Sequence, residues 1–315
     1  MPAVTTNDLA TLPAVGALPP GWISRPVLGV TTSTTGFEGN GFPVRRGFAG
    51  VSLEDLDPFV HLDQMGEVTY GPGEAKGTPW HPHRGFETVT YMIDGAMEHA
   101  DSNGGGGLIA DGDTQWMTAG RGIVHIETPP ADVVAEGGIF HGVQLWVNLP
   151  SGKKWIEPHY QLIRSGAVTL ARSEDGMALA RIIAGVVGDH HGPGSTHSPI
   201  GLVHATIQPG GRLTLPWPST FNALLYVLSG TVHVGPERAP MVTGQLARFG
   251  AGDALLIEAQ LEQGNRTGLL DVLVMGGQAI GEPVAWSGPF VMNTEEEIRQ
   301  AFDDYAAGVF GGPPS

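Results

Sequence analysis

The chain has 315 residues, a formal net charge of −16 and no cysteine, and only 15% of its residues are charged. Without thiols there are no disulfides, iron–sulfur clusters or thiolate metal sites, so histidine and carboxylate remain as metal ligands. The negative charge disfavours direct binding to nucleic acid. The 48 glycines and 25 prolines favour short strands and tight turns over helices.

The first 22 residues read as an extended arm, because four prolines interrupt them. Residues 1–18 contain no Lys or Arg and no long apolar core, which argues against a signal peptide. No uninterrupted apolar run approaches the length that spans a membrane. We therefore expect a soluble, cytoplasmic protein.

Beyond the arm, apolar runs of about six residues alternate with Gly, Asn and Pro breaks, as strands in an all-β protein do. Representative runs are residues 88–93, 144–148, 223–228 and 269–274.

Two short motifs in the first half carry ligand-type side chains at spacing i, i+2. One motif is His81-Pro82-His83, and the other is His125-Ile126-Glu127. Alternate side chains of a strand point to the same face, so both pairs can enter one cavity if their strands face each other. The motifs predict a metal site of three imidazoles and one carboxylate.

This ligand set suits iron(II), manganese, nickel, copper or zinc, and the sequence alone does not choose among them. Four protein ligands on an octahedral metal leave about two positions open, enough for a substrate oxygen and dioxygen. Glu87, four residues after His83, competes with Glu127 for the carboxylate position. We expect Glu127 to be the ligand and Glu87 to accept a hydrogen bond that orients an imidazole.

An internal repeat predicts two related barrels. Residues 91–95 resemble residues 226–230 at an offset of 135, and Gly112-Asp113 resembles Gly252-Asp253 at an offset of 140. The apolar pattern breaks near residues 155–170, where we expect the boundary. The expected units are the arm (1–22), a metal-binding domain (23–160), a metal-free domain (161–290) and a C-terminal helix with its tail (291–315).

The same offsets test the metal site in the second half. They place Pro216 and Pro218 where the first half has His81 and His83, and Asn265 and Thr267 where it has His125 and Glu127. All four ligands are lost, so the repeat predicts a single metal site in the first barrel.

A helix is predicted near the C-terminus. Thr294 and Glu297 form a capping box, followed by an apolar stripe that ends before Gly308. The stripe comprises Ile298, Ala301, Phe302 and Tyr305.

Other polar residues are weaker candidates, because ordinary core hydrogen bonding explains them at least as well as function. Those near the motifs are His99, Asp101, Gln115, His141 and Gln144. A second group, His190, His191 and His197, lies in a loop rich in Gly, Pro and Ser.

The chain resembles the pirin family of the cupin superfamily over residues 25–308. The resemblance is carried by residues 81–91, 99–102, 112–125, 144–150 and 288–294. It implies a bicupin, that is, two antiparallel β-barrel or jelly-roll domains with metal in the first barrel alone. It also implies that iron is held by His81, His83, His125 and Glu127. Ile126 departs from the serine often found there, but its side chain should point away from the metal.

The resemblance implies two activities. Some members are described as quercetin 2,3-dioxygenases, which open a flavonol ring with dioxygen; here Glu127 or Glu87 would accept the flavonol proton. Other members are described as redox-responsive regulators that bind a transcription factor or a metabolic enzyme. The fold does not decide between them.

Overall fold

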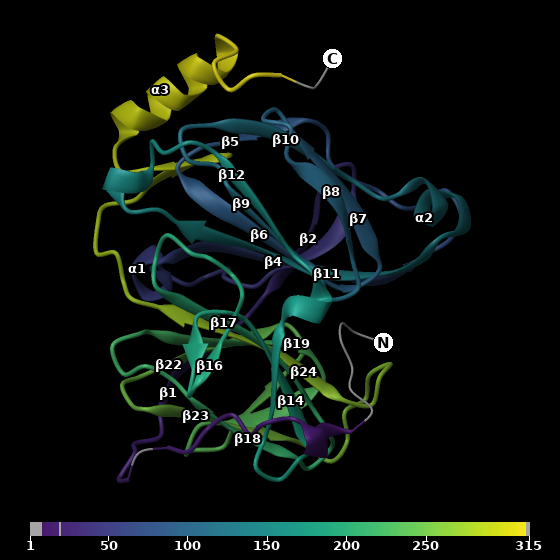
Figure 1. Cartoon of the computed structure of the whole chain (residues 1–315), viewed down its shortest axis with the longest axis vertical. Coiled ribbons are helices and arrows are strands. Elements are labelled where there is room, and N and C mark those ends of the chain that lie inside the picture. Colours follow the sequence, from purple (N-terminus) through teal and green to yellow (C-terminus); the bar gives the residue numbers. More distant parts are fainter. Residues whose placement is uncertain (1–7, 19, 313–315) are drawn as a thin grey trace.

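The computed structural model describes residues 8–18 and 20–312 and consists of two β-barrels stacked along the long axis of the molecule (Figure 1). The strands of both barrels pair antiparallel, which confirms the predicted all-β bicupin. Parts of the expected arm (1–7 and 19) and tail (313–315) lie outside the described residues. No helix in the described ranges is both long and apolar enough to cross a membrane.

The first barrel is built from strands β2 to β12. Their bounds are β2 (Thr34–Glu38), β3 (Phe42–Arg46), β4 (Phe59–Tyr70), β5 (His81–His83), β6 (Phe86–Asp94), β7 (Ala96–Asp101), β8 (Gly106–Ala110), β9 (Thr114–Thr118), β10 (Ile123–Thr128), β11 (Gly138–Asn148) and β12 (His159–Ile163). A seven-stranded sheet, ordered β12-β9-β6-β11-β4-β3-β2, faces a four-stranded sheet, ordered β5-β10-β7-β8.

The second barrel repeats this arrangement. Its strands are β1 (Val27–Thr32), β13 (Thr169–Arg172), β14 (Ala178–Ala184), β17 (Ile200–Ile207), β18 (Arg212–Pro216), β19 (Ala223–Ser229), β20 (Thr231–Val234), β21 (Ala239–Val242), β22 (Gln245–Phe249), β23 (Ala254–Ala259) and β24 (Leu270–Gly277). The seven-stranded sheet has the order β1-β22-β19-β24-β17-β14-β13, and the four-stranded sheet has the order β18-β23-β20-β21.

The remaining elements are short, apart from the C-terminal helix. They are η1 (Leu9–Thr11), α1 (Leu53–Leu56), α2 (Ala131–Glu136), η2 (Ser151–Lys153), η3 (Ser165–Ala167), β15 (Val186–Val187), β16 (His190–His191), β25 (Ala285–Ser287), β26 (Phe290–Met292) and α3 (Glu295–Ala306). The predicted capping box is present, since Thr294 and Glu297 each bond the other's backbone N–H. Ile298 is buried as expected, whereas Phe302 is 44% exposed, so the packed stripe is narrower than the sequence suggests.

The two seven-stranded sheets pack against each other and form the core between the barrels. Every residue of β6 is buried, because both faces of this strand are covered. Val89 and Tyr91 pack in one cluster with Tyr226 and Leu228 of the second barrel. Phe86, which lies on the other face of β6, packs inside the first barrel. The apolar run that predicted this strand is therefore continuous because it is buried on both sides.

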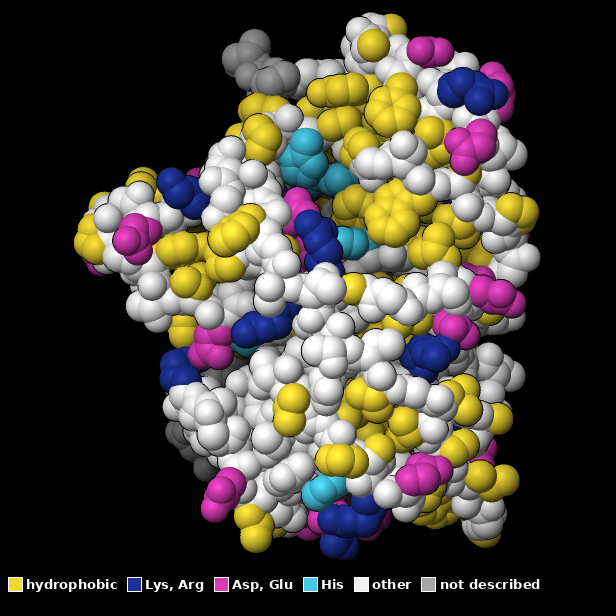
Figure 2. Space-filling view, turned by 180° about the vertical axis from the view of Figure 1, so that it is seen from behind, with side chains coloured by type: hydrophobic (Ala, Val, Ile, Leu, Met, Phe, Trp, Pro, Cys, Tyr) yellow, Lys and Arg dark blue, Asp and Glu magenta, His cyan; other side chains and the backbone are white. Residues whose placement is uncertain are grey.

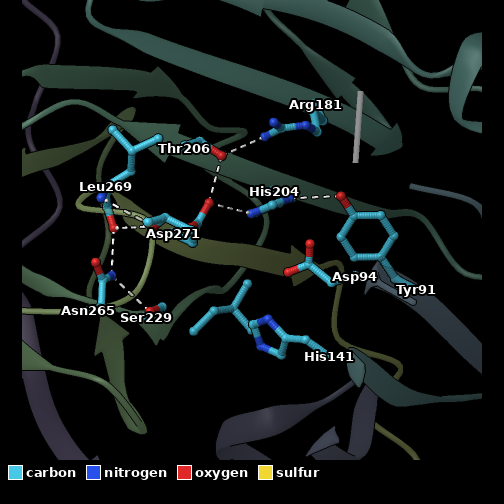
Figure 3. Close-up of polar contacts among 12 residues, drawn as sticks. Tyr91, Asp94, His141, Arg181, His204, Thr206, Ser229, Asn265, Leu269 and Asp271 are labelled. Carbon is cyan, nitrogen blue, oxygen red and sulfur yellow. Dashed lines mark hydrogen bonds and ion pairs between the residues drawn. The ribbon is translucent and has the colours of Figure 1, made fainter. Parts of the chain in front are cut away.

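A buried polar chain crosses this core from one barrel to the other (Figure 3). The Tyr91 hydroxyl lies 2.8 Å from Nδ1 of His204, and Nε2 of His204 lies 3.1 Å from Oδ1 of Asp271. Burial lowers the pKa of His204 and opposes ionisation of Asp271, but hydrogen bonds from His204 and Thr206 lower the pKa of Asp271 overall. Since buried polar groups are costly unless paired, this chain favours one alignment of the two sheets.

Both ends of the described chain cross to the other barrel, which the expected domain boundaries do not anticipate. Strand β1 lies within the segment expected in the first domain, yet it pairs with β22 of the second barrel. Conversely, β25 and β26 follow the second barrel in the sequence but pack on the first, where Phe290 forms a bridge with Arg84. Helix α3 packs there too, against Val124. Alternating hydrophobicity identifies a strand but does not say which sheet edge it joins.

Replacing Tyr91 with phenylalanine tests the polar chain. The variant leaves Nδ1 of buried His204 without its partner, so we expect the free energy of unfolding to fall by about 1 to 3 kcal/mol in urea denaturation. Tyr305→Phe is the matched control, because the Tyr305 side chain is 40% exposed on α3. Equal losses in the two variants would contradict a stabilising role for the chain.

Candidate metal centre

Three of the predicted ligands meet inside the first barrel. Strands β5 and β10 pair so that His81 lies directly opposite His125, and His83 lies opposite Ile123. The ring centroids of His81 and His125 are 4.2 Å apart, and those of His83 and His125 are 4.9 Å apart. One nitrogen from each of the three rings lies within 4.8 Å of the others. The i, i+2 spacing thus has the geometric effect that the sequence predicts.

Contacts with backbone carbonyls occupy Nδ1 of His81 and His83 and leave Nε2 of each ring free to bind a metal. Nδ1 of His81 lies 2.8 Å from the carbonyl oxygen of Pro79, and Nδ1 of His83 lies 3.2 Å from that of Pro289. Since a carbonyl can only accept, each Nδ1 carries the proton and each Nε2 keeps its lone pair. Nε2 of His125 is buried without a hydrogen-bond partner in the described part of the chain. The three Nε2 atoms suit a metal ion, which would also give the buried Nε2 of His125 the partner that it lacks.

Burial also keeps two of the imidazoles neutral. It lowers the pKa of His83 and of His125 well below the ordinary value, and the neighbouring imidazoles lower them further. A neutral imidazole is the form that binds a metal, so the site is preset for coordination.

Glu127 shares the inward face of β10 with His125, two residues away. Its Oε1 accepts hydrogen bonds from Thr90 at 3.0 Å and Gln115 at 3.3 Å, and its Oε2 accepts one from Gln144 at 3.0 Å. A carboxylate oxygen of Glu127 lies within 4.8 Å of a nitrogen of His125 and one of His99, in a second cluster that overlaps the first at His125. The structure therefore brings Glu127 to the site, and its ligation remains a prediction.

His99, a weaker candidate in the sequence, is the fifth ligand-type group at this site. It lies directly across from Glu127 on β7, and its Nδ1 is 3.3 Å from Nδ1 of His125. Its Nε2 is 3.3 Å from Oδ2 of Asp101, and its ring stacks on Tyr160. Burial disfavours the charge on Asp101, but hydrogen bonds from His99 and from backbone N–H groups lower its pKa overall. Asp101 therefore holds His99 against His125.

Two family models match the chain. The Pirin family model matches residues 41–147, and the model of the Pirin C-terminal cupin domain matches residues 202–311. The chain belongs to the pirin family. It is 40% identical over 274 residues to a Pseudomonas aeruginosa protein named as a candidate quercetin 2,3-dioxygenase, covering 86% of this chain and 93% of that protein.

Two further relatives belong to the same comparison. Human pirin is 38% identical over 271 residues, which cover 85% of this chain and 88% of that protein. The crystal structure of quercetin 2,3-dioxygenase from Acinetobacter baumannii is 35% identical with a TM-score of 0.85, and the match covers 92% of this chain and 99% of that one.

The second pirin barrel has an apolar interior where the first has its ligands, although at other positions than the sequence predicts. By sheet order, β18 and β23 correspond to β5 and β10. Their inward cross-strand pairs are Leu213 with Ile257 and Leu215 with Leu255, all buried in one hydrophobic core. These four leucine and isoleucine side chains, rather than the predicted prolines, asparagine and threonine, fill the equivalent space.

Asn265 and Thr267 were misplaced because the two Gly-Asp turns that set the offset of 140 do not correspond. Gly112-Asp113 precedes β9, whereas Gly252-Asp253 precedes β23, the counterpart of β10. The other landmark of the repeat is correct, since Gly95 follows β6 and Gly230 follows β19. The offset of 135 fails before these strands, because residues 84–85 join β5 to β6 whereas the longer segment 217–222 joins β18 to β19, and this misplaced Pro216 and Pro218. Asn265 and Thr267 consequently lie after β23, in the loop before β24.

Glu87 lies away from the imidazoles, so the structure does not support the role expected for it. It belongs to the face of β6 that looks toward the second barrel, opposite to Thr90, which bonds Glu127. Its Oε1 accepts a 2.7 Å hydrogen bond from Thr118, and burial raises its pKa to about 7. Among the described residues no imidazole bonds to it. The spacing of four from His83 misled because the chain turns at Gly85 before β6 begins.

The remaining weaker candidates divide between the two faces of the sheet and a distant loop. Gln115 and Gln144 bond Glu127, as described. His141 lies 2.8 Å from Gln64 and faces the second barrel. His190 and His191 form strand β16, and neither belongs to a metal-type cluster of the described residues.

A cavity of about 450 Å³ opens onto the metal centre. Figure 2 shows histidine side chains in this hollow of the first barrel, beside large hydrophobic side chains. Aromatic walls come from Phe42, Trp146 and Trp286, and the ring of His83 lies 5.2 Å from that of Trp146. The sequence reading missed the polar side of this cavity, His61 and Asp63. The same i, i+2 rule that found the ligands could have found this pair.

The C-terminal strap, defined as residues 285–292, fixes one wall of the site. It supplies the carbonyl of Pro289 that binds His83. The buried ammonium of Lys154 joins the strap to the barrel by donating to the carbonyls of Val291 and Gly85 and to the side chain of Asn148, each within 2.8 Å. Burial lowers the pKa of Lys154 to about 7.

Lys154→Met removes the donor that joins the strap to the barrel. The change leaves three buried oxygens unpaired, so we expect the free energy of unfolding to fall by about 2 to 4 kcal/mol and metal affinity to weaken. Urea denaturation and metal titration measure the two effects. Lys153→Met is the control, since Lys153 is exposed. Unchanged metal affinity in the Lys154 variant would show that the strap does not position His83.

Glu87→Gln tests the assignment of Glu87 to the barrel interface. Because folding raises its pKa from 4.5 to about 7, the carboxyl binds its proton more tightly in the folded chain. Stability from this group is therefore full below pH 4.5 and is lost as the pH rises through 7, by about 3 kcal/mol. We expect this loss to disappear in the glutamine variant when unfolding is compared at pH 5 and pH 8.

The exposed Glu136, at the end of α2, supplies the control variant Glu136→Gln. It should retain the pH dependence of the parent protein. Metal content should also be unchanged in Glu87→Gln. A loss of metal in this variant would show that Glu87 belongs to the metal site.

Proposed function

We propose that this protein is a metal-dependent dioxygenase of the quercetin 2,3-dioxygenase type, which opens a flavonol ring with dioxygen. The observation that carries the proposal is a set of three imidazoles with free nitrogens at the base of an aromatic cavity. A volume of about 450 Å³ lies within the usual range for small-molecule pockets. The similarity to proteins named as quercetin 2,3-dioxygenases supports this choice.

We assign His81, His83, His125 and Glu127 as the ligands, with iron(II) as the metal and manganese, nickel, copper or zinc as alternatives. A bound iron(II) would supply the redox chemistry that dioxygen requires. The protein supplies position: Gln115, Gln144 and Thr90 hold Glu127, and the pair of His99 and Asp101 holds His125. Trp146 and Trp286 give the flavonol rings flat apolar surfaces.

The test combines elemental analysis with an oxygen electrode. Iron-loaded protein should consume oxygen with quercetin, and His83→Ala should lose both the metal and the oxygen uptake. His233→Ala, on β20 of the second barrel, is the matched control and should keep both. Metal-replete protein that consumes no oxygen with any of several flavonols would refute the proposal.

A non-catalytic regulatory protein is the second candidate. Two features of the second barrel favour it. The interior of this barrel is apolar. The barrel also packs against Tyr91 of β6, which is next to Thr90, the residue that bonds Glu127. In this case the metal state would alter binding to a protein partner. Iron-loaded protein without oxygen uptake, but with a partner affinity that differs between ferrous and ferric forms, would favour this function.

A further inference from the structure

His61 and Asp63 form a close pair on the cavity side of β4. Both line the cavity over the metal centre, and Nε2 of His61 lies 3.1 Å from Oδ2 of Asp63. Asp63 is 3% exposed, and its Oδ1 is buried without a hydrogen-bond partner in the described ranges. A buried carboxylate facing an imidazole fixes the tautomer of that imidazole.

The pairing of β4 with β11 places this pair beside the substrate surfaces. His61 lies directly across from Trp146, and Asp63 lies across from Gln144. The His61 ring is 5.1 Å from the ring of Trp146 and 6.0 Å from that of Trp286. An aromatic substrate between these indoles would therefore present its edge to His61.

The tautomer leaves an acceptor on the cavity side of the imidazole. A carboxylate oxygen 3.1 Å from Nε2 of His61 favours the tautomer that carries its proton on Nε2, in which Nδ1 keeps its lone pair. No hydrogen-bond partner for Nδ1 exists among the residues that the structure describes, and the His61 side chain is 18% exposed. The nitrogen is therefore accessible to a molecule in the cavity.

Asp63 also lies close to a guanidinium. Arg46 on β3 lies 3.8 Å from Asp63 and also pairs with Glu38 on β2. One guanidinium thus faces two carboxylates, which leaves one negative charge that an imidazolium would balance. The other titratable groups lining the cavity are His81 and His83 of β5.

Glu127 is less available for the same task. Its two oxygens already accept three hydrogen bonds, from Thr90, Gln115 and Gln144. A carboxylate offers about four lone-pair positions, so one remains, and the proposed ligand set gives that one to the metal rather than to a substrate hydroxyl.

We propose that His61, held by Asp63, is the catalytic base that accepts the proton of a hydroxyl group on an aromatic substrate in this cavity. The O–H bond of the substrate breaks, an N–H bond forms at Nδ1 of His61, and the oxygen keeps the electron pair as negative charge. The imidazolium is then paired with Asp63. This inference rests on the proposed function, since it takes a hydroxylated aromatic ring as the substrate.

The experiment reads the protonation state of bound quercetin without dioxygen. Iron-loaded protein is titrated anaerobically with quercetin, and the absorption spectrum distinguishes the neutral flavonol from its anion. We expect the parent protein to bind the anion. His61→Gln retains a donor toward Asp63 but cannot take up the proton, so it should bind the neutral form and lose about 100-fold in turnover.

Two further variants complete the design. Asp63→Asn should move the formation of the bound anion to higher pH, because an amide does not stabilise an imidazolium. It also tests the proposal if His61→Gln does not fold. His233→Gln, on the second barrel, should match the parent protein, and equal iron content across the variants shows that the metal site is intact.

The outcomes separate this inference from the proposed function. Anion formation in the parent protein that is lost in His61→Gln, without oxygen uptake, supports the base and refutes the dioxygenase. Oxygen uptake with the anion still bound in His61→Gln refutes the base and leaves the dioxygenase. A parent protein that leaves the quercetin spectrum unchanged also overturns the inference.

Discussion

A strand in a sheet sends successive side chains to opposite faces, and β6 uses the two faces for different purposes. Thr90 points into the first barrel and donates to Glu127, whereas Tyr91 points out of it and reaches His204 of the second barrel. The metal centre and the polar chain at the barrel interface are therefore one residue apart along a buried backbone. Neither can shift along the strand without moving the other, because a slip of one residue would exchange the two faces.

The geometry of the site also depends on backbone carbonyls far from it in sequence. The ring of His83 is held by Pro289, which is 206 residues away, and the nearby Gly85 is held by Lys154. Burying an ammonium is costly unless all of its donors are used, and Lys154 uses all three. The position of His83 in the first barrel therefore depends on a segment that follows the second barrel in the sequence.

The sequence predicted what depends on local periodicity. His81, His83 and His125 were found because the period of a strand is two, and the capping box at Thr294 because its pattern is contiguous. The period of a strand does not predict how far apart two side chains lie when a turn separates them. Glu87 was placed in the site by counting from His83, although the intervening turn sends it to the other face. The pairing of β1 with the second barrel and the burial of Lys154 depend on tertiary contacts, which leave no periodic signal in the sequence.

The exchange of chain ends between the barrels affects how the protein is organised as a unit. Strand β1 closes the second barrel from the N-terminal side, and the strap and α3 cover the first from the C-terminal side. Each of the two cupin segments is therefore completed by a piece of chain that lies on the far side of the other segment in the sequence. Neither segment, cut from the chain at the linker, would contain all the strands and covering elements of its own barrel. The two halves are repeats in sequence, but they are not independent modules for folding or recombination.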